Sequence, residues 1–167
     1  MQNSRNRLVE LRKLLDNFSS GSESPEVQGE LARFLVIRSA GYIENTFETC
    51  IQHFTAAHSH PFVASHVRAG LFRGRNPSPD VLIERTRSLN DNWAADLEEY
   101  LNEDDSRVRR ELQYLVDRRN RIAHGQSESV NRRKALDLAD LALALGDRFT
   151  DLFNPVPDSP ERPRTSD

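Results

Sequence analysis

Apolar residues recur at three- and four-residue steps along almost the whole chain, and this spacing constrains the fold more than any other feature. Leu8, Leu11 and Leu15 follow it near the N-terminus, and Leu97 and Leu101 follow it further along. Such steps match the period of an α-helix that buries one face. No segment alternates apolar and polar residues convincingly, as a half-buried strand would. The sequence therefore predicts an all-α fold of helices packed as a bundle.

Capping and turn-forming residues divide the chain into its expected helices. Ser24 is a suitable N-cap, with Pro25 at the first helical position and Glu26 in the first turn. The Gly, Asn and Pro residues of segment 73–79 predict a loop. The apolar stripe of the long second helix shifts around its axis near Gly41, so this helix either kinks there or buries two faces. The helices are expected at 2–18, 25–58, 61–73, 80–101, 104–124 and 130–153.

One domain accounts for these helices, because a chain of this length can bury a single sizeable core. We assign it residues 1–153. Residues 154–167 contain four prolines and no apolar residue after Val156, so we expect a disordered tail there. The core should hold the aromatic residues that lie at helical spacings. These are Phe34, Tyr42, Phe47, Phe54 and Trp93.

Composition excludes several classes of protein. The net charge of −3 argues against the broad basic surface of a protein that coats nucleic acid, so any contact with RNA should be local. No run of about 18 apolar residues and no N-terminal signal segment is present, so neither membrane insertion nor secretion is indicated. The single cysteine, Cys50, cannot form an internal disulfide. We expect a cytoplasmic protein without membrane contact.

The segment Arg118-Arg119-Asn120-Arg121-Ile122-Ala123-His124-Gly125 carries the strongest functional signal. In a chain with 21 Arg, 11 Asn and 5 His, an Arg-Asn pair followed at this spacing by His is expected by chance only about 0.04 times. Asn120 and His124 are one helical turn apart and share a face. Arg119 falls within the apolar stripe of its helix. A charge there needs a partner, because an unpaired buried charge costs several kcal/mol or more.

Two structural interpretations compete with a functional one. His124, just before Gly125, could simply be a cationic residue that the dipole at a helix C-terminus favours. Arg119 could pair with a carboxylate of the long helix, either Glu44 or Glu48, as a structural ion pair. Alternatively, Arg119 could bind a phosphate. The last two roles are compatible, because a carboxylate behind a catalytic arginine can orient it.

The chain resembles the HEPN domains (higher eukaryotes and prokaryotes nucleotide-binding), whose mark is an Arg, a polar residue, several others and then His. Arg119, Asn120 and His124 fit that mark. The segments Arg38-Ser-Ala-Gly-Tyr-Ile-Glu-Asn45 and Asn-Pro-Ser-Pro-Asp at 76–80, together with Trp93, look like the subgroup called RiboL-PSP-HEPN. The resemblance covers roughly residues 28–153. It implies an antiparallel helical bundle of four to six helices that pairs as a two-fold dimer.

The resemblance also implies a metal-independent endoribonuclease, of the toxin or defence type. His124 would transfer a proton to or from the reacting oxygens, because the pKa of histidine near neutrality suits both directions. Arg119 would stabilise the charge that develops on the phosphate oxygens. Asn120 would orient the imidazole or hold a phosphate oxygen, and Arg118 and Arg121 would guide the RNA backbone.

A dimer would complete this site, because two motif helices facing each other across a two-fold axis supply two histidines from one gene. The expected products are a 2′,3′-cyclic phosphate and a 5′-OH. Glu44 matches a recurrent acidic position of the family and would support Arg119 from behind. No cofactor is implied. His53, His58, His60 and His66 lack a recognised ligand spacing, so we do not expect a metal site.

Regulation and the rival function also follow from the resemblance. Some HEPN toxins carry a Tyr two residues after the His, which a partner enzyme modifies, but this chain has Gln126 there. Any restraint should therefore come from a different antitoxin or regulatory protein. The alternative function is a non-catalytic HEPN-type module for dimerisation, for adaptor contacts or for nucleotide binding. An accidental motif in a generic helical protein would leave the other matching segments unexplained.

Overall fold

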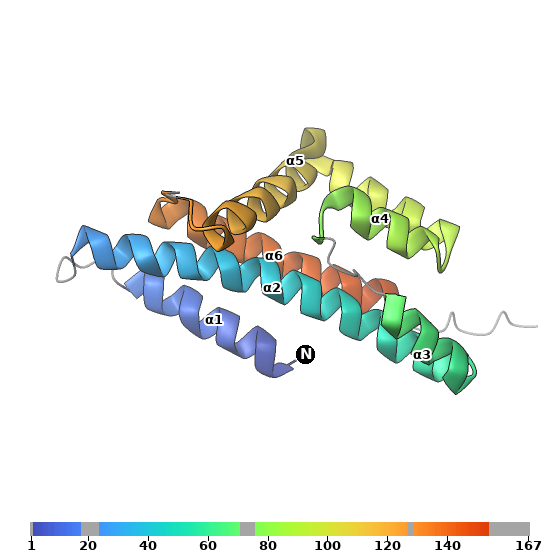
Figure 1. Ribbon diagram of the computed structural model, residues 1–167. Helices are drawn as coiled ribbons and strands as arrows, with labels where there is room; N and C mark the ends of the chain where they lie inside the picture. Colours follow the sequence, from blue (N-terminus) through green and yellow to red (C-terminus); the bar gives the residue numbers. More distant parts are fainter. Residues whose placement is uncertain (1, 18–23, 71–75, 127–128, 154–167) are drawn as a thin grey trace, which may run out of the picture.

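The computed structural model describes residues 2–17, 24–70, 76–126 and 129–153, and within these ranges every regular element is an α-helix (Figure 1). The all-α expectation is therefore confirmed. The expected tail at 154–167 and the last residues of the helix expected at 61–73 lie outside the described residues. The helices are α1 (Gln2–Asn17), α2 (Pro25–His58), α3 (Pro61–Gly70), α4 (Pro79–Arg87), α5 (Asp91–Ala123) and α6 (Arg132–Phe153).

The pair α2 and α6 forms the centre of the bundle, and the two helices run side by side through the middle of Figure 1. The Phe47 ring meets the edges of Phe149 and Phe153, with centroids 5.0 and 5.7 Å apart. Where Tyr42 crosses Gly146, a Cβ added to the glycine would lie 2.4 Å from the tyrosine oxygen. Glycine at this position therefore leaves the space that the Tyr42 ring occupies against α6.

Helix α2 begins as its sequence indicates and continues without a break. The Ser24 hydroxyl accepts a hydrogen bond from the backbone N–H of Val27, at 3.3 Å. Gly41 lies on the exposed side of the helix, and a Cβ there would meet nothing within 4 Å. Of the two alternatives for the shifting apolar stripe, the helix buries a wide face instead of kinking, because α1, α5 and α6 all pack on it.

The expectation of one continuous helix over 80–101 is wrong, because α4 ends at Arg87 and a new helix begins at Asp91. The amide oxygen of Asn90 accepts hydrogen bonds from the backbone N–H groups of Asn92 and Trp93, at 2.9 and 3.1 Å. Asn90 thus caps a new helix, α5, and the preceding turn separates α4 from it. This Asn followed by acidic Asp91 is an N-terminal signal, which the unbroken apolar spacing obscured.

The boundary expected between Leu101 and Asp104 is a kink inside α5. Glu103 has an extended backbone, and the next three residues, Asp104, Asp105 and Ser106, have φ angles of 49°, 55° and 60°. Arg110 donates a hydrogen bond to the carbonyl oxygen of Asp105 across the kink. Figure 1 shows the two arms of α5 meeting there, with α4 beside the first arm. The second arm carries the Arg-Asn…His motif.

The aromatic residues follow the expectation with one exception. Phe47 and Tyr42 are buried, and Trp93 is half-buried, with its ring 4.8 Å from Phe54 and 5.5 Å from Phe153. Phe34 was expected in the core, yet 49% of it is exposed. None of the described helices combines the length and the apolar character that crossing a lipid bilayer requires.

Candidate active site

The end of α5 is fixed by a glycine turn directly after the motif histidine. Gly125 has a φ of 70°, its N–H donates to the carbonyl of Ile122, and the N–H of Gln126 donates to that of Arg121, both at 3.0 Å. This pair of bonds around a left-handed glycine is the Schellman arrangement that closes helices. His124 is the C-cap residue, and its own N–H donates to the Asn120 carbonyl. The exposed His124 side chain therefore lies at the C-terminal end of α5.

Arg119 is held by two amide oxygens. Its Nη1 donates to Oδ1 of Asn76 at 3.1 Å and to Oδ1 of Asn120 at 3.2 Å. The side chain is half-buried, as the apolar stripe around it indicates. Among the described residues no carboxylate pairs with it. The ion pair with Glu44 or Glu48 is therefore not formed, because the guanidinium turns toward the segment that precedes α4.

Glu44 and Glu48 lie one turn apart on α2 and are half-buried there. Burial raises the pKa of Glu48, and the neighbouring charge of Glu44 raises it further. The structure thus places these carboxylates where they act on each other. Among the described residues no hydrogen bond or ion pair joins Glu44 to Arg119, and the supporting role of Glu44 stays a prediction.

The remaining motif residues are spread around the helix end. His124 and Arg121 are exposed, and the guanidinium carbon of half-buried Arg118 lies 4.8 Å from the centre of the Tyr114 ring. Asn120 directs its amide oxygen to Arg119. Within the described part of the chain, no side chain forms a hydrogen bond with the imidazole of His124.

A hollow with a mixed lining adjoins the helix end on the side of α2. It measures about 440 Å³, and its apolar part is formed by Phe34 and Ile37 of α2 with Ile122 of the motif. Polar and charged residues, Glu30, Arg33 and Gln126, complete the lining with Gly125. Phe34 is the exposed aromatic residue that the sequence assigned to the core. Helical spacing identifies the apolar face of a helix, but it does not determine whether other residues of the same chain cover that face.

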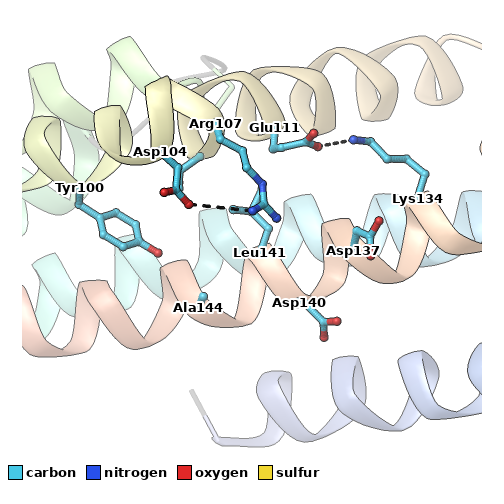
Figure 2. Close-up of a pocket in the computed structure, with 10 residues that line it drawn as sticks. Tyr100, Asp104, Arg107, Glu111, Lys134, Asp137, Asp140, Leu141 and Ala144 are labelled. Carbon is cyan, nitrogen blue, oxygen red and sulfur yellow. Dashed lines mark hydrogen bonds and ion pairs between the residues drawn. The ribbon is translucent and has the colours of Figure 1, made fainter.

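A second hollow, of about 420 Å³, lies between α5 and α6 beside the kink (Figure 2). Its charged residues are largely paired with one another, Glu111 with Lys134 and Asp104 with Arg107, and the second pair is 4.0 Å apart. No residue of the Arg-Asn…His motif lines it. The Glu111–Lys134 ion pair connects α5 to α6, and the Asp104–Arg107 ion pair lies at the kink of α5. These charged residues therefore have a structural role.

Asn76 is the contact that sequence reasoning missed. In the sequence the Asn-Pro-Ser-Pro-Asp segment is a mark of family resemblance, and this mark indicates no role for its first residue. A partner 43 positions away from Arg119 cannot be identified from spacing within one helix. The need for an acceptor was visible in the sequence, but its identity depends on how α4 packs on α5.

Comparison with known proteins identifies the family of this chain. The family model RiboL-PSP-HEPN matches residues 2–155, which includes α1 as well as the segments that carry the resemblance. Searches of the curated proteins and of the solved structures gave no match. The matched residues span nearly all of the chain, and it therefore belongs to the RiboL-PSP-HEPN family.

Proposed function

We propose that this protein is a metal-independent endoribonuclease whose site forms where two copies of the α5 end meet. The observation that carries the proposal is the set of hydrogen-bond partners of Arg119. Its guanidinium is anchored by neutral amide oxygens, and no carboxylate among the described residues compensates its charge. A positive charge kept in place in this way, five residues before an exposed histidine at the same helix end, suits the stabilisation of a phosphate in a transition state.

The reaction requires one proton to leave and one to arrive. The 2′-oxygen of the RNA attacks the adjacent phosphorus as a base takes its proton, and the bond from phosphorus to the 5′-oxygen breaks as an acid protonates that oxygen. His124 of one subunit would serve as the base and His124 of the partner subunit as the acid. Arg119 would bind the phosphate oxygens, with Asn120 beside it, while Arg118 and Arg121 would guide the backbone.

A second copy of the chain is the partner that we assign to the hollow beside the motif, which combines uncovered apolar side chains with the charged residues Glu30 and Arg33. Phe34 and Ile37 are next to Ile122 of the motif, and a two-fold contact there would bury all three on both sides. Full burial of an exposed large apolar side chain contributes about 1.5–3 kcal/mol, and each of these three would contribute less because it is already part-buried. The same contact would bring the two His124 residues to one interface and restrict the freedom that each imidazole has in a single subunit.

The alternative is a non-catalytic HEPN-type module for dimerisation, adaptor contacts or nucleotide binding. One observation favours it: in one subunit no described residue fixes the imidazole of His124, although a general base needs a defined position. The two functions differ in whether dimerisation gives His124 a role in bond cleavage or only brings subunits together.

The chemistry of the products tests the proposal. Purified protein is incubated in excess EDTA with an RNA oligonucleotide and with its 2′-O-methyl counterpart, which has no free 2′-hydroxyl. We expect cleavage of the RNA alone, with 2′,3′-cyclic phosphate and 5′-OH ends. Cleavage of the methylated strand, or 5′-phosphate ends, would require another mechanism. Absence of cleavage by a confirmed dimer would favour the adaptor function.

A further inference from the structure

We propose that Asn76, in the segment before α4, is a positioning residue that holds Nη1 of Arg119. The positive charge of the guanidinium and its edge formed by Nε and Nη2 then remain available to bind the scissile phosphate. The inference rests on the proposed ribonuclease function and adds a residue outside the Arg-Asn…His motif to its site. It also gives α4 a part in catalysis, although α4 contributes nothing to the motif itself.

The guanidinium of Arg119 has one nitrogen, Nη1, that is hydrogen-bonded within the protein, and two others, Nε and Nη2, that could bind a ligand. Nη1 donates to both Asn76 and Asn120, and it carries two hydrogens for these two bonds. Within the described residues no hydrogen bond occupies Nε or Nη2. These two nitrogens form the edge of an arginine that binds a phosphate through parallel hydrogen bonds. Arg119 is therefore held by one nitrogen and can present the opposite edge to a ligand.

The neutrality of both acceptors distinguishes Arg119 from the arginines of this chain that pair with carboxylates. Arg5 pairs with Asp147, and Arg109 pairs with Asp80. A carboxylate holds a guanidinium more strongly than an amide does, but it also compensates the charge that a transition state would use. Two amide oxygens fix the orientation of Arg119 and leave its charge uncompensated.

The backbone around Asn76 is well fixed, so its amide can serve as an anchor. Pro77 and Pro79 are buried, and the N–H of Ser78 donates to the Asn76 carbonyl at 2.8 Å. The Ser78 hydroxyl then caps α4, accepting from Val81 N at 3.4 Å. The ion pair between Asp80 and Arg109 ties this end of α4 to the second arm of α5. Packing of α4 thus determines where Arg119 is held.

The first test compares Asn76→Ala and Asn76→Asp with Asn102→Ala, an exposed position on α5. For Asn76→Ala we expect kcat for RNA cleavage to fall about 10- to 100-fold, as for small displacements of catalytic groups. KM, and the Kd for uncleavable 2′-O-methyl RNA, should change less than about threefold. Asn102→Ala should match the wild type. A kcat for Asn76→Ala within twofold of the wild type would overturn the proposal.

Asn76→Asp separates positioning from a purely structural role. A carboxylate at this place keeps the bond to Nη1 but compensates the charge of Arg119, so kcat should remain low although the fold is at least as stable. If Asn76 only secured α4, the stronger ion pair of Asn76→Asp would restore kcat fully. Full restoration would therefore contradict the inference, and thermal melting of each variant monitors the fold.

An independent measurement does not depend on cleavage. The NMR signals of the Arg119 guanidinium, assigned by their loss in Arg119→Lys, should show a restrained Nη1 group in the wild type and in Asn76→Asp. They should show faster rotation in Asn76→Ala. Unchanged signals in Asn76→Ala would overturn the positioning role. If the wild type cleaves no RNA, the proposed function fails, and these signals still decide whether Asn76 holds Arg119.

Discussion

The backbone N–H of Gln126 donates to the carbonyl oxygen of Arg121 across the end of α5, and the two atoms are 3.0 Å apart. Gly125 lies between them with a φ of 70°, a conformation that favours glycine. This closure ends the helix at His124 and determines where the imidazole stands. The last turn of α5 therefore links helix termination to the candidate chemistry.

Gly125→Ala should weaken this closure. A side chain in the left-handed region costs about 1–2 kcal/mol, and a Cβ at Gly125 would meet no atom within 4 Å, so sterics with neighbours add nothing. We expect a loss of stability of that size in urea unfolding and a lower kcat, because His124 shifts. Gly29→Ala is the matched control, since Gly29 lies inside α2 with open space around it and alanine favours a helix. A Gly125→Ala protein as stable and as active as the wild type would contradict this account.

Phe34→Glu should separate the subunits. Phe34 is 49% exposed beside the motif, and a charge at its position would oppose burial against a second copy. We expect light scattering to show a dimer for the wild type and a monomer for the variant, with RNA cleavage lost as well. Phe62→Glu changes an even more exposed phenylalanine on α3 and should remain dimeric. A dimeric, active Phe34→Glu would place the interface elsewhere.

Glu48 should make the stability of the fold depend on pH. Burial and the charge of Glu44 raise its pKa above the ordinary value of 4.5. Between these two pKa values the folded protein holds a proton that the unfolded chain has released, so stability falls as the pH rises through this window. Glu48→Gln removes the ionisation and should raise Tm at pH 7, with a smaller gain at pH 4. Exposed Glu10→Gln should show no such difference, and an equal gain for Glu48→Gln at both pH values would refute the explanation.

Local signals in the sequence predicted much of the fold. The cap at Ser24 and the apolar periodicity placed the long central helix, and the glycine after His124 placed the end of α5. The break at Asn90 was missed because apolar residues keep their helical spacing across it. The left-handed residues after Glu103 were missed because none of them is glycine, the residue that usually marks such a backbone.

The candidate site was predicted in part. The motif residues lie together at one helix end because they are close in sequence. The acceptor for Arg119 was expected on α2 as a carboxylate, whereas it comes from the segment before α4 as an amide. The identity of the acceptor depends on which helices pack against α5. The spacing of residues along one helix does not determine that packing. The exposure of Phe34 is likewise a property of the whole arrangement.

The measurement that tests the central claim most directly is the rate of RNA cleavage in excess EDTA by wild type, His124→Ala and the control His53→Ala, with the dimer verified for each. His53 is an exposed histidine of α2 outside the motif. We predict cleavage by the wild type and by His53→Ala, and a loss of about 100-fold or more for His124→Ala. Cleavage by a dimeric His124→Ala at the rate of the wild type would contradict the claim.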